Sequence, residues 1–193
     1  MKNYKNSLNH FFSLIEAFEQ TPSIGKKSAQ KMAYNLSVSD KYLGLKIAHL
    51  LENAIDNIRK CTICGGLSED EICEICMDEE RINGQLCMVL HPKDIFTIEE
   101  VGDFKGQYWV IEELESLDFE TLKKYIQKST ITEIIFAFSP TLANEAIMLY
   151  VEDKLDDMDL NFTKIAQGVP TGIGLENIDQ LSLSRAFSSR VKL

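Results

Sequence analysis

Four of the five cysteines form two Cys-x2-Cys pairs separated by eight residues: Cys61 and Cys64, then Cys73 and Cys76. Each pair can place two thiolates on one ion from a tight turn, and two such turns complete the tetrahedral shell that Zn²⁺ accepts. Gly65 and Gly66 directly follow the first pair and supply the backbone freedom that the turn requires. Because four thiolates leave no coordination position for water, the spacing predicts a structural zinc ribbon over residues 61–76. Four unrelated thiols, or a redox pair, are the alternative.

The fifth cysteine, Cys87, stands apart in a predicted strand, where a buried free thiol is expected. No stretch of the 193 residues is apolar enough to span a membrane, and the start, MKNYKNSLNH, lacks an apolar signal core. We therefore expect a cytoplasmic protein without a membrane association, in which the cysteines are reduced thiols or metal ligands.

The first 60 residues predict three helices. The first carries an apolar stripe at helical spacing: Leu8, Phe11, Phe12, Ile15 and Phe18. Thr21-Pro22 interrupts it, because the residue before proline is disfavoured in the α region. The second begins near Lys26 and has an apolar stripe at Ala29, Met32, Ala33 and Leu36. The third begins at Asp40 as N-cap and is expected to bury Leu43, Ile47, Leu50, Leu51, Ala54 and Ile58.

After the cysteines, short apolar strands alternate with helices. Strands are predicted over residues 86–90, 108–111, 133–138 and 162–166, and helices near 94–101, 118–128 and 142–155. Such alternation predicts an α/β fold with parallel strands and right-handed crossovers. The expected organisation is a helical module (1–60), a zinc ribbon (61–76), an α/β domain (80–170) and a C-terminal helical tail (171–193).

The segment between the first two helices, PSIGKKSA (residues 22–29), has the form of a helix–hairpin–helix. A glycine turn there presents backbone N–H groups at the start of the second helix, where the helix dipole also favours a phosphate. Lys27 and Lys31 are four residues apart and so share one face, opposite the apolar stripe, and Lys26 adds to the same field. Gly25, Lys26, Lys27 and Lys31 are thus candidate residues for sequence-independent DNA binding. A lysine-rich surface helix after a turn is the alternative.

The charge is divided along the chain. The net charge is −10, which by itself disfavours nucleic acid, but residues 1–60 carry nine Lys/Arg against five Asp/Glu. The remaining residues carry eleven Lys/Arg against twenty-five Asp/Glu. A basic N-terminal part followed by an acidic remainder fits DNA binding by the N-terminal part. The alternative is that both the basic and the acidic charges merely lie on solvated surfaces.

Together the hairpin and the cysteine ribbon resemble the RecR family of bacterial recombination mediators. The matching stretches are PSIGKKSAQKMAYNL, the ribbon, CMVLHPKDIFTIE, SPTLANEA and AQGVPTGIGLENIDQLSLSRA, in family order over nearly the whole chain. The resemblance implies a helix–hairpin–helix, a four-cysteine zinc finger, a Toprim domain and a C-terminal tail that serves oligomerisation.

The same resemblance implies a non-enzymatic role in DNA repair. Such proteins work with RecO, and in many bacteria with RecF, to place RecA on single-stranded DNA, and they form ring-like homo-oligomers, commonly tetramers. It also implies that Lys27 and Lys31 contact DNA, that Glu145 lies where the family has an acidic residue for partner binding, and that the protein is associated with the nucleoid.

The chain departs from the family pattern at several points. Ser23 replaces the first glycine of the hairpin, and Leu90, followed by His91, stands where the first Toprim strand usually ends in glutamate. Ser139 and Ala143 replace other motif residues, and residues 111–114, IEEL, replace a glycine-rich loop. These departures indicate a divergent member with an altered partner-facing surface.

A Toprim-type nuclease or topoisomerase is a second hypothesis. Its chemistry requires several carboxylates converging on Mg²⁺, whereas this sequence has Leu90 and Ser139-Pro140-Thr141 at the expected positions. Residues 168–174, GVPTGIG, lack the lysine of a nucleotide-binding loop, and the three histidines are scattered. We therefore expect no catalytic residues. A third hypothesis is a zinc-ribbon interaction module without a DNA role.

Overall fold

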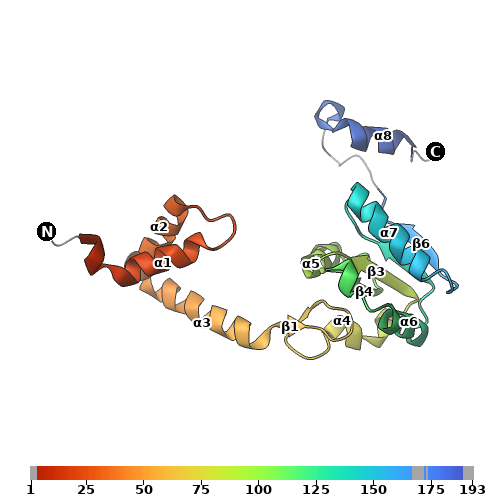
Figure 1. Cartoon of the computed structure of the whole chain (residues 1–193), viewed down its shortest axis with the longest axis horizontal. Coiled ribbons are helices and arrows are strands. Elements are labelled where there is room, and N and C mark those ends of the chain that lie inside the picture. Colours follow the sequence, from red (N-terminus) through yellow and green to blue (C-terminus); the bar gives the residue numbers. More distant parts are fainter. Residues whose placement is uncertain (1–3, 167–171, 173, 189–193) are drawn as a thin grey trace. The chain divides into compact units, whose positions relative to one another are not determined.

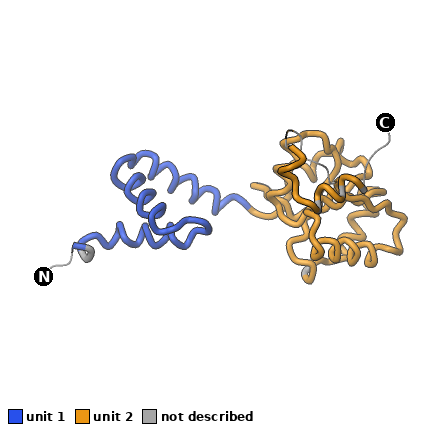
Figure 2. The backbone as a smooth tube through the Cα atoms, turned by 90° about the horizontal axis from the view of Figure 1, so that it is seen from above, with its two compact units in different colours: residues 1–58 blue, residues 59–193 orange. Residues whose placement is uncertain are grey.

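The computed structural model describes residues 4–166, 172 and 174–188. The chain forms two compact units, Met1–Ile58 and Arg59–Leu193, which Figure 2 draws in different colours. No helix in the described part of the chain is long and apolar enough to cross a membrane. The finer division of the second unit into ribbon, α/β domain and tail stays a prediction.

The first unit is helical, as predicted. Its elements are the 3-10 turn Tyr4–Ser7, α1 (Asn9–Glu19), α2 (Lys26–Tyr34), the π-helical turn η2 (Asn35–Ser39) and α3 (Lys41–Asn57) (Figure 1). Helices α1 and α2 pack against each other around buried Ile15, Ala29 and Ala33. The half-buried residues around this cluster are Phe11, Phe12, Leu14, Phe18 and Ile24. The predicted apolar stripes of α1 and α2 therefore form one small core.

The junction between α2 and α3 depends on two residues. Asp40 caps α3, because its Oδ1 accepts a hydrogen bond of 2.9 Å from the Leu43 amide, as the sequence predicted. Gly44 lies so close to η2 that an added Cβ would overlap the Leu36 carbonyl oxygen. Any larger side chain at Gly44 would therefore push α3 away from η2.

The expected burial of the α3 stripe is wrong for the single chain. Leu43, Ile47, Leu50, Leu51 and Ile58 are 37–58% exposed, Ala54 is half-buried, and Tyr42, Leu45 and Ile55 are at least 72% exposed. The reason is that α3 packs mainly against η2, at its own N-terminal end. Periodicity predicts which face of a helix is apolar, but it does not say which surface covers that face.

The second unit contains the predicted parallel sheet. The strands are β3 (Gln85–Val89), β4 (Gln107–Val110), β5 (Glu133–Phe136) and β6 (Asn161–Lys164), in the order β4-β3-β5-β6. All three pairings are parallel. The connecting helices are α5 (Pro92–Val101), α6 (Phe119–Lys128) and α7 (Leu142–Lys154). The α/β fold class predicted from the alternation is confirmed, and the strands and helices begin and end within about two residues of their predicted bounds.

Both faces of the sheet are covered, and successive strand residues alternate between them. Leu86 and Met88 point into a core shared with α6 and α7, whereas Cys87 and Val89 point into a core shared with α5. Cys87 is the buried thiol that the sequence predicted, and burial raises its pKa to about 12.

Short elements flank the sheet. The ribbon contains β1 (Arg59–Lys60), β2 (Leu67–Ser68) and the single turn α4 (Glu74–Met77), and 3-10 turns occur at Glu79–Arg81 and Leu114–Ser116. Towards the C-terminus come the 3-10 turn Leu175–Asn177 and α8 (Gln180–Ser188), the expected tail helix. Residues 168–171 and 173 of the predicted glycine-containing loop, and 189–193 of the predicted tail, lie outside the described residues.

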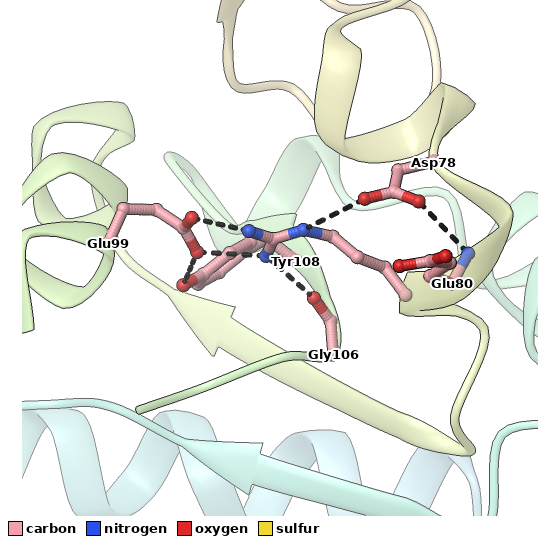
Figure 3. A network of polar contacts seen from close by, with 6 residues as sticks. Asp78, Glu80, Glu99, Gly106 and Tyr108 are labelled. Carbon is pink, nitrogen blue, oxygen red and sulfur yellow. Dashed lines mark hydrogen bonds and ion pairs between the residues drawn. The ribbon is translucent and has the colours of Figure 1, made fainter. Parts of the chain in front are cut away.

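A polar network centred on Arg81 joins the segment after the ribbon to the sheet (Figure 3). The guanidinium binds Glu99 through two hydrogen bonds of 2.9 and 2.5 Å and also donates to the Gly106 carbonyl oxygen. The buried Tyr108 donates its hydroxyl to the same carboxylate at 2.6 Å, and Asp78 lies 3.8 Å from the Arg81 Nε. Hydrogen bonding from Arg81 holds the pKa of Glu99 below its usual range.

Glu99→Gln should lower the free energy of unfolding by about 1–3 kcal/mol near neutral pH, because it removes the charge from a bidentate, partly buried pair. A carboxyl group with a lowered folded-state pKa stabilises the protein above its unfolded pKa of about 4.3, and the stabilisation is lost as the pH falls below that value. The difference between wild type and variant in urea unfolding should therefore shrink between about pH 5 and pH 3. Glu100→Gln, at an exposed neighbouring position, is the control; a pH-independent difference for Glu99→Gln would contradict the assignment.

Candidate functional site

The two cysteine pairs converge on one point. The sulfur atoms of Cys61, Cys64, Cys73 and Cys76 all lie within 4.8 Å of one another, and Cys64 Sγ is 3.6 Å from Cys73 Sγ. A tetrahedron with Zn–S bonds of about 2.3 Å has sulfur–sulfur edges of about 3.8 Å. The four thiols therefore fit a tetrahedral zinc ion with all four ligands from protein.

The local backbone explains the convergence. The Cys61 amide closes the first turn by donating to the Gly66 carbonyl oxygen at 2.7 Å, and Gly65 adopts a φ of +75°, which favours glycine. The Gly66 amide donates to Cys64 Sγ and the Cys73 amide donates to Cys61 Sγ, both at 3.3 Å. Such N–H donors stabilise the negative charge that thiolate ligands carry.

Ionisation of the four thiols is interdependent. A hydrogen bond from Cys64 lowers the pKa of Cys73, whereas hydrogen bonding with Cys73 raises the pKa of Cys64 and hydrogen bonding with Cys64 raises that of Cys76. A divalent cation that takes all four thiolates must displace the remaining protons. Zinc binding at this cluster should therefore release protons and weaken in acid.

The ribbon is attached directly to the α/β sheet. The Val110 amide, at the end of β4, donates a 2.8 Å hydrogen bond to the Cys64 carbonyl oxygen. Lys60 forms an ion pair with Glu112, and Ile75 packs against the α5-side core. The cluster thus joins the ribbon to the sheet, a structural role that a closed four-thiolate site can fill.

Removing zinc should destabilise the second unit by on the order of 10 kcal/mol, because the binding free energy of a structural zinc ion contributes to the folding free energy of a small ribbon. The measurement is zinc stoichiometry by elemental analysis together with thermal unfolding, for wild type and for Cys73→Ser. Cys87→Ser is the matched control: it changes a buried thiol outside the cluster and should retain the same zinc content as wild type. Equal zinc content in Cys73→Ser and wild type would contradict the site.

The hairpin between α1 and α2 is tight. The Ile24 amide donates to the Thr21 carbonyl oxygen at 3.2 Å, and Ser23 has a φ of +67°. A left-handed conformation costs a non-glycine residue about 1–2 kcal/mol, which explains why the RecR pattern has glycine here. Ser23 keeps the turn but introduces strain.

Gly25 forms the N-cap of α2 with a φ of −85°, and its carbonyl oxygen accepts hydrogen bonds from the Ser28 and Ala29 amides. A Cβ added at Gly25 would meet nothing within 4 Å, so the fold of the unit does not require glycine at this position. Glycine does leave the first amides of α2 accessible to a ligand. These amides lack intrahelical acceptors and lie at the positive end of the helix dipole, an arrangement that binds phosphate.

The predicted lysines lie together on α2. Lys26, Lys27 and Lys31 are all exposed, and Lys27 and Lys31 lie on the face of α2 opposite Ala29 and Ala33, which are completely buried. The structure therefore places Lys27 and Lys31 on one face of α2, and Gly25 and Lys26 at its N-terminal end; a role of these residues in DNA binding stays a prediction.

The carboxyl edge of the sheet carries different residues from those of a metal-dependent nuclease. Leu90 packs into the core shared with α6 and α7. Thr141 caps α7 by accepting a hydrogen bond from the Asn144 amide, and the Asn144 side chain donates to the Ser139 carbonyl oxygen at 2.8 Å. Among the described residues, the four cysteines are the only group of three or more potential metal ligands close enough to share an ion.

Glu145 lies in the first turn of α7, half-buried. It borders an open groove of about 430 Å³ between α7 and the edge strand β6. The other lining residues are Phe136, Met148, Leu149, Glu152, Phe162, Thr163 and Lys164. The groove combines an apolar floor with two carboxylates.

Comparisons with known proteins agree with this arrangement. Residues 12–55 match the RecR helix-hairpin-helix family model, and residues 58–78 match the model of the RecR zinc finger domain with four cysteines. Over 192 residues and the full length of both chains, the sequence is 59% identical to the "Recombination protein RecR" of Helicobacter pylori strain Shi470. The chain belongs to the RecR family. Identity to the RecR proteins of a Nitratiruptor species and of Campylobacter jejuni subsp. doylei is 50% and 46%, covering 98% and 96% of this chain and 100% and 98% of theirs.

Membership of the RecR family confirms the resemblance inferred from the hairpin and ribbon, and the family's zinc-finger model confirms the four-cysteine zinc site. Sequence reasoning missed the Arg81–Glu99–Tyr108 network and the ion pair between Lys60 and Glu112. No local pattern in the sequence marks these residues, because each interaction joins residues that are separated along the chain and are of common types.

Proposed function

We propose that this chain is a non-catalytic mediator of recombinational DNA repair. It binds DNA through Gly25, Lys26, Lys27 and Lys31, assembles into a homo-oligomeric ring, with a tetramer as the expected form, and works on the nucleoid in the cytoplasm. Its proposed partner is RecO, with RecF as a further candidate, and its task is to help load RecA on single-stranded DNA. The recombination function carried in the names of its RecR relatives supports this role.

The observation that carries the proposal is the exposed start of α2. The first amides of the helix, which have no intrahelical acceptors, and the ammonium groups of Lys27 and Lys31 can bind successive phosphates. Such contacts do not depend on base sequence. This basic surface belongs to a chain with a net charge of −10, so DNA binding is confined to the part of the surface with local positive potential.

The double substitution Lys27→Ala/Lys31→Ala should weaken DNA binding and flatten its dependence on salt. Removing one phosphate contact should reduce the slope of log K against log salt by about 0.7–0.9. The measurement is a salt titration of binding by fluorescence anisotropy, with Mg²⁺ present and the DNA checked for nicks.

The matched control is Lys124→Ala/Lys128→Ala, which removes two exposed lysines four residues apart on α6. It changes net charge equally and should leave affinity and slope within experimental error of wild type. Equal weakening in both variants would show a nonspecific effect of net charge. Binding that ignores Lys27 and Lys31 would support a zinc-ribbon interaction module, and nicked DNA would support the nuclease alternative.

The residues at the carboxyl edge of the sheet support a non-catalytic role. Phosphodiester cleavage through Mg²⁺ needs carboxylates at the positions that Leu90 and Ser139 occupy. Leu90 instead contributes to the core, and Ser139 and Thr141 take part in capping α7.

The groove beside Glu145 is the proposed partner surface. Residues 61–193 are strongly acidic, and Glu145 and Glu152 border an apolar floor that includes Met148 and Phe162. Such a surface fits a basic, partly apolar segment, and its negative field repels DNA. This chemistry suits RecO as a partner.

The exposed stripe of α3 supports oligomerisation. Ile47, Leu51 and Ile55, spaced four residues apart, are 42–72% exposed along one side of α3, and an exposed apolar surface of this kind marks a protein interface. A second copy of the chain is the proposed occupant. Joining several basic hairpins would add weak phosphate contacts at high effective concentration.

Leu51→Gln/Ile55→Gln should therefore produce a smaller oligomer and weaken DNA binding at least about tenfold through reduced multivalency. The exposed positions carry little of the single-chain core, so helix content should be retained. Glu52→Gln/Asp56→Asn, on the same helix, is the control and should leave the oligomer intact. Sedimentation velocity measures the oligomeric state. An unchanged oligomer in Leu51→Gln/Ile55→Gln would argue against this interface.

A further inference from the structure

A depression lies on the first unit directly beside the proposed phosphate-binding lysines. It is open, has a volume of about 650 Å³, and is lined by Phe11, Lys27, Gln30, Lys31, Tyr34 and Asn35. Its volume falls in the range of about 300–1,000 Å³ that is usual for small-ligand sites. The lining combines two ammonium groups, two carboxamides and two aromatic rings.

Tyr34 is the exposed aromatic member of this lining. It ends α2, three residues after Lys31 and seven after Lys27, so all three lie on one helical face. Its side chain is 56% exposed. The cluster that holds α1 and α2 together consists of Ile15, Ala29, Ala33 and their apolar neighbours, and Tyr34 lies outside it. The ring is therefore not required for the core of the unit.

An exposed aromatic ring beside lysines suits one class of ligand. Unpaired bases stack on aromatic side chains while cationic groups bind the adjacent phosphates, and such binding tolerates any base sequence. In a duplex the bases are already stacked and paired, so their faces cannot reach the ring. Tyr34 lies one helical turn, about 5 Å along the axis, beyond Lys31, which is near enough for one nucleotide to contact both.

We propose that Tyr34 is a stacking platform for an unpaired base, and that the depression selects single-stranded over double-stranded nucleic acid. The proposal rests on the proposed DNA-binding function and assigns a discriminating residue within it. Lys27 and Lys31 hold the backbone of either form, whereas Tyr34 contacts only a strand with free bases. Gln30 and Asn35 offer amide groups to the base edge.

A second copy of the chain is the competing occupant of this depression. The lining argues against it, because the cores of protein interfaces are depleted in lysine, and two of the six lining residues are lysines. The apolar residues exposed on α3 form a much better surface for a second copy.

The test compares Tyr34→Leu, Tyr34→Phe and wild type in the full-length zinc-loaded protein. The ligands are a single-stranded oligonucleotide, its duplex, and an abasic strand of equal length that keeps the phosphates. Tyr34→Leu should weaken binding to the single strand about tenfold and leave the duplex and the abasic strand within about twofold of wild type. Tyr34→Phe, which keeps the ring, should bind all three as wild type does.

The salt dependence separates this proposal from the one on which it rests. In Tyr34→Leu the log–log salt slope should equal that of wild type, because every phosphate contact is retained. The stacking proposal is wrong, and the DNA-binding surface stands, if Lys27→Ala/Lys31→Ala loses affinity while Tyr34→Leu binds the single strand normally. The same conclusion follows if Tyr34→Leu binds all three ligands equally more weakly than wild type. If the lysine variant also binds normally, the DNA surface itself is wrong. A changed oligomeric state in Tyr34→Leu, measured by light scattering, would assign the ring to an interface between copies and overturn the platform.

Discussion

The hydrogen bond from the Val110 amide to the Cys64 carbonyl oxygen ties the zinc ribbon to the end of β4. This hydrogen bond holds the ribbon on the sheet only while the turn at Cys61 and Cys64 keeps its shape. That shape depends on four thiolates converging on one ion. The ribbon has little apolar core of its own: the side chains around the thiols are Ile63, Ile72 and Ile75. Zinc thus substitutes for the hydrophobic burial that so short a segment cannot supply.

The ribbon and the Arg81 network reinforce each other from the two ends of one segment. The cysteines fix the start of the second unit on β4. Arg81, five residues after Cys76, binds Glu99 of α5 and the Gly106 carbonyl oxygen just before β4. Both attachments meet the same edge of the sheet, because β4 is the edge strand. The edge is therefore covered by chain that is itself anchored through a metal site and an ion pair.

The sequence predicts those features that rest on local spacing. The Cys-x2-Cys pairs specify the metal, alternating apolar runs specify the parallel strands, and Asp40 specifies the start of α3. The predicted burial of α3 failed because apolar periodicity is the same whether a helix is covered by its own chain or by another. Arg81, Glu99 and Gly44 were missed because their roles depend on tertiary contacts that no pattern in the sequence marks.

The exposed α3 and the small basic surface of α2 have a common physical explanation. At the proposed DNA-binding surface, three lysines and one helix N-terminus would make only a few phosphate contacts, each weakened by salt, on a chain whose overall charge opposes DNA. A single copy would therefore bind poorly. The length of apolar surface on α3 is costly to expose in water, so its cover by a further copy would stabilise the assembly and bring several α2 surfaces together at once. The proposed oligomer would therefore account both for the exposed stripe of α3 and for the small size of the proposed DNA-binding surface, because the unit that binds DNA would be the oligomer.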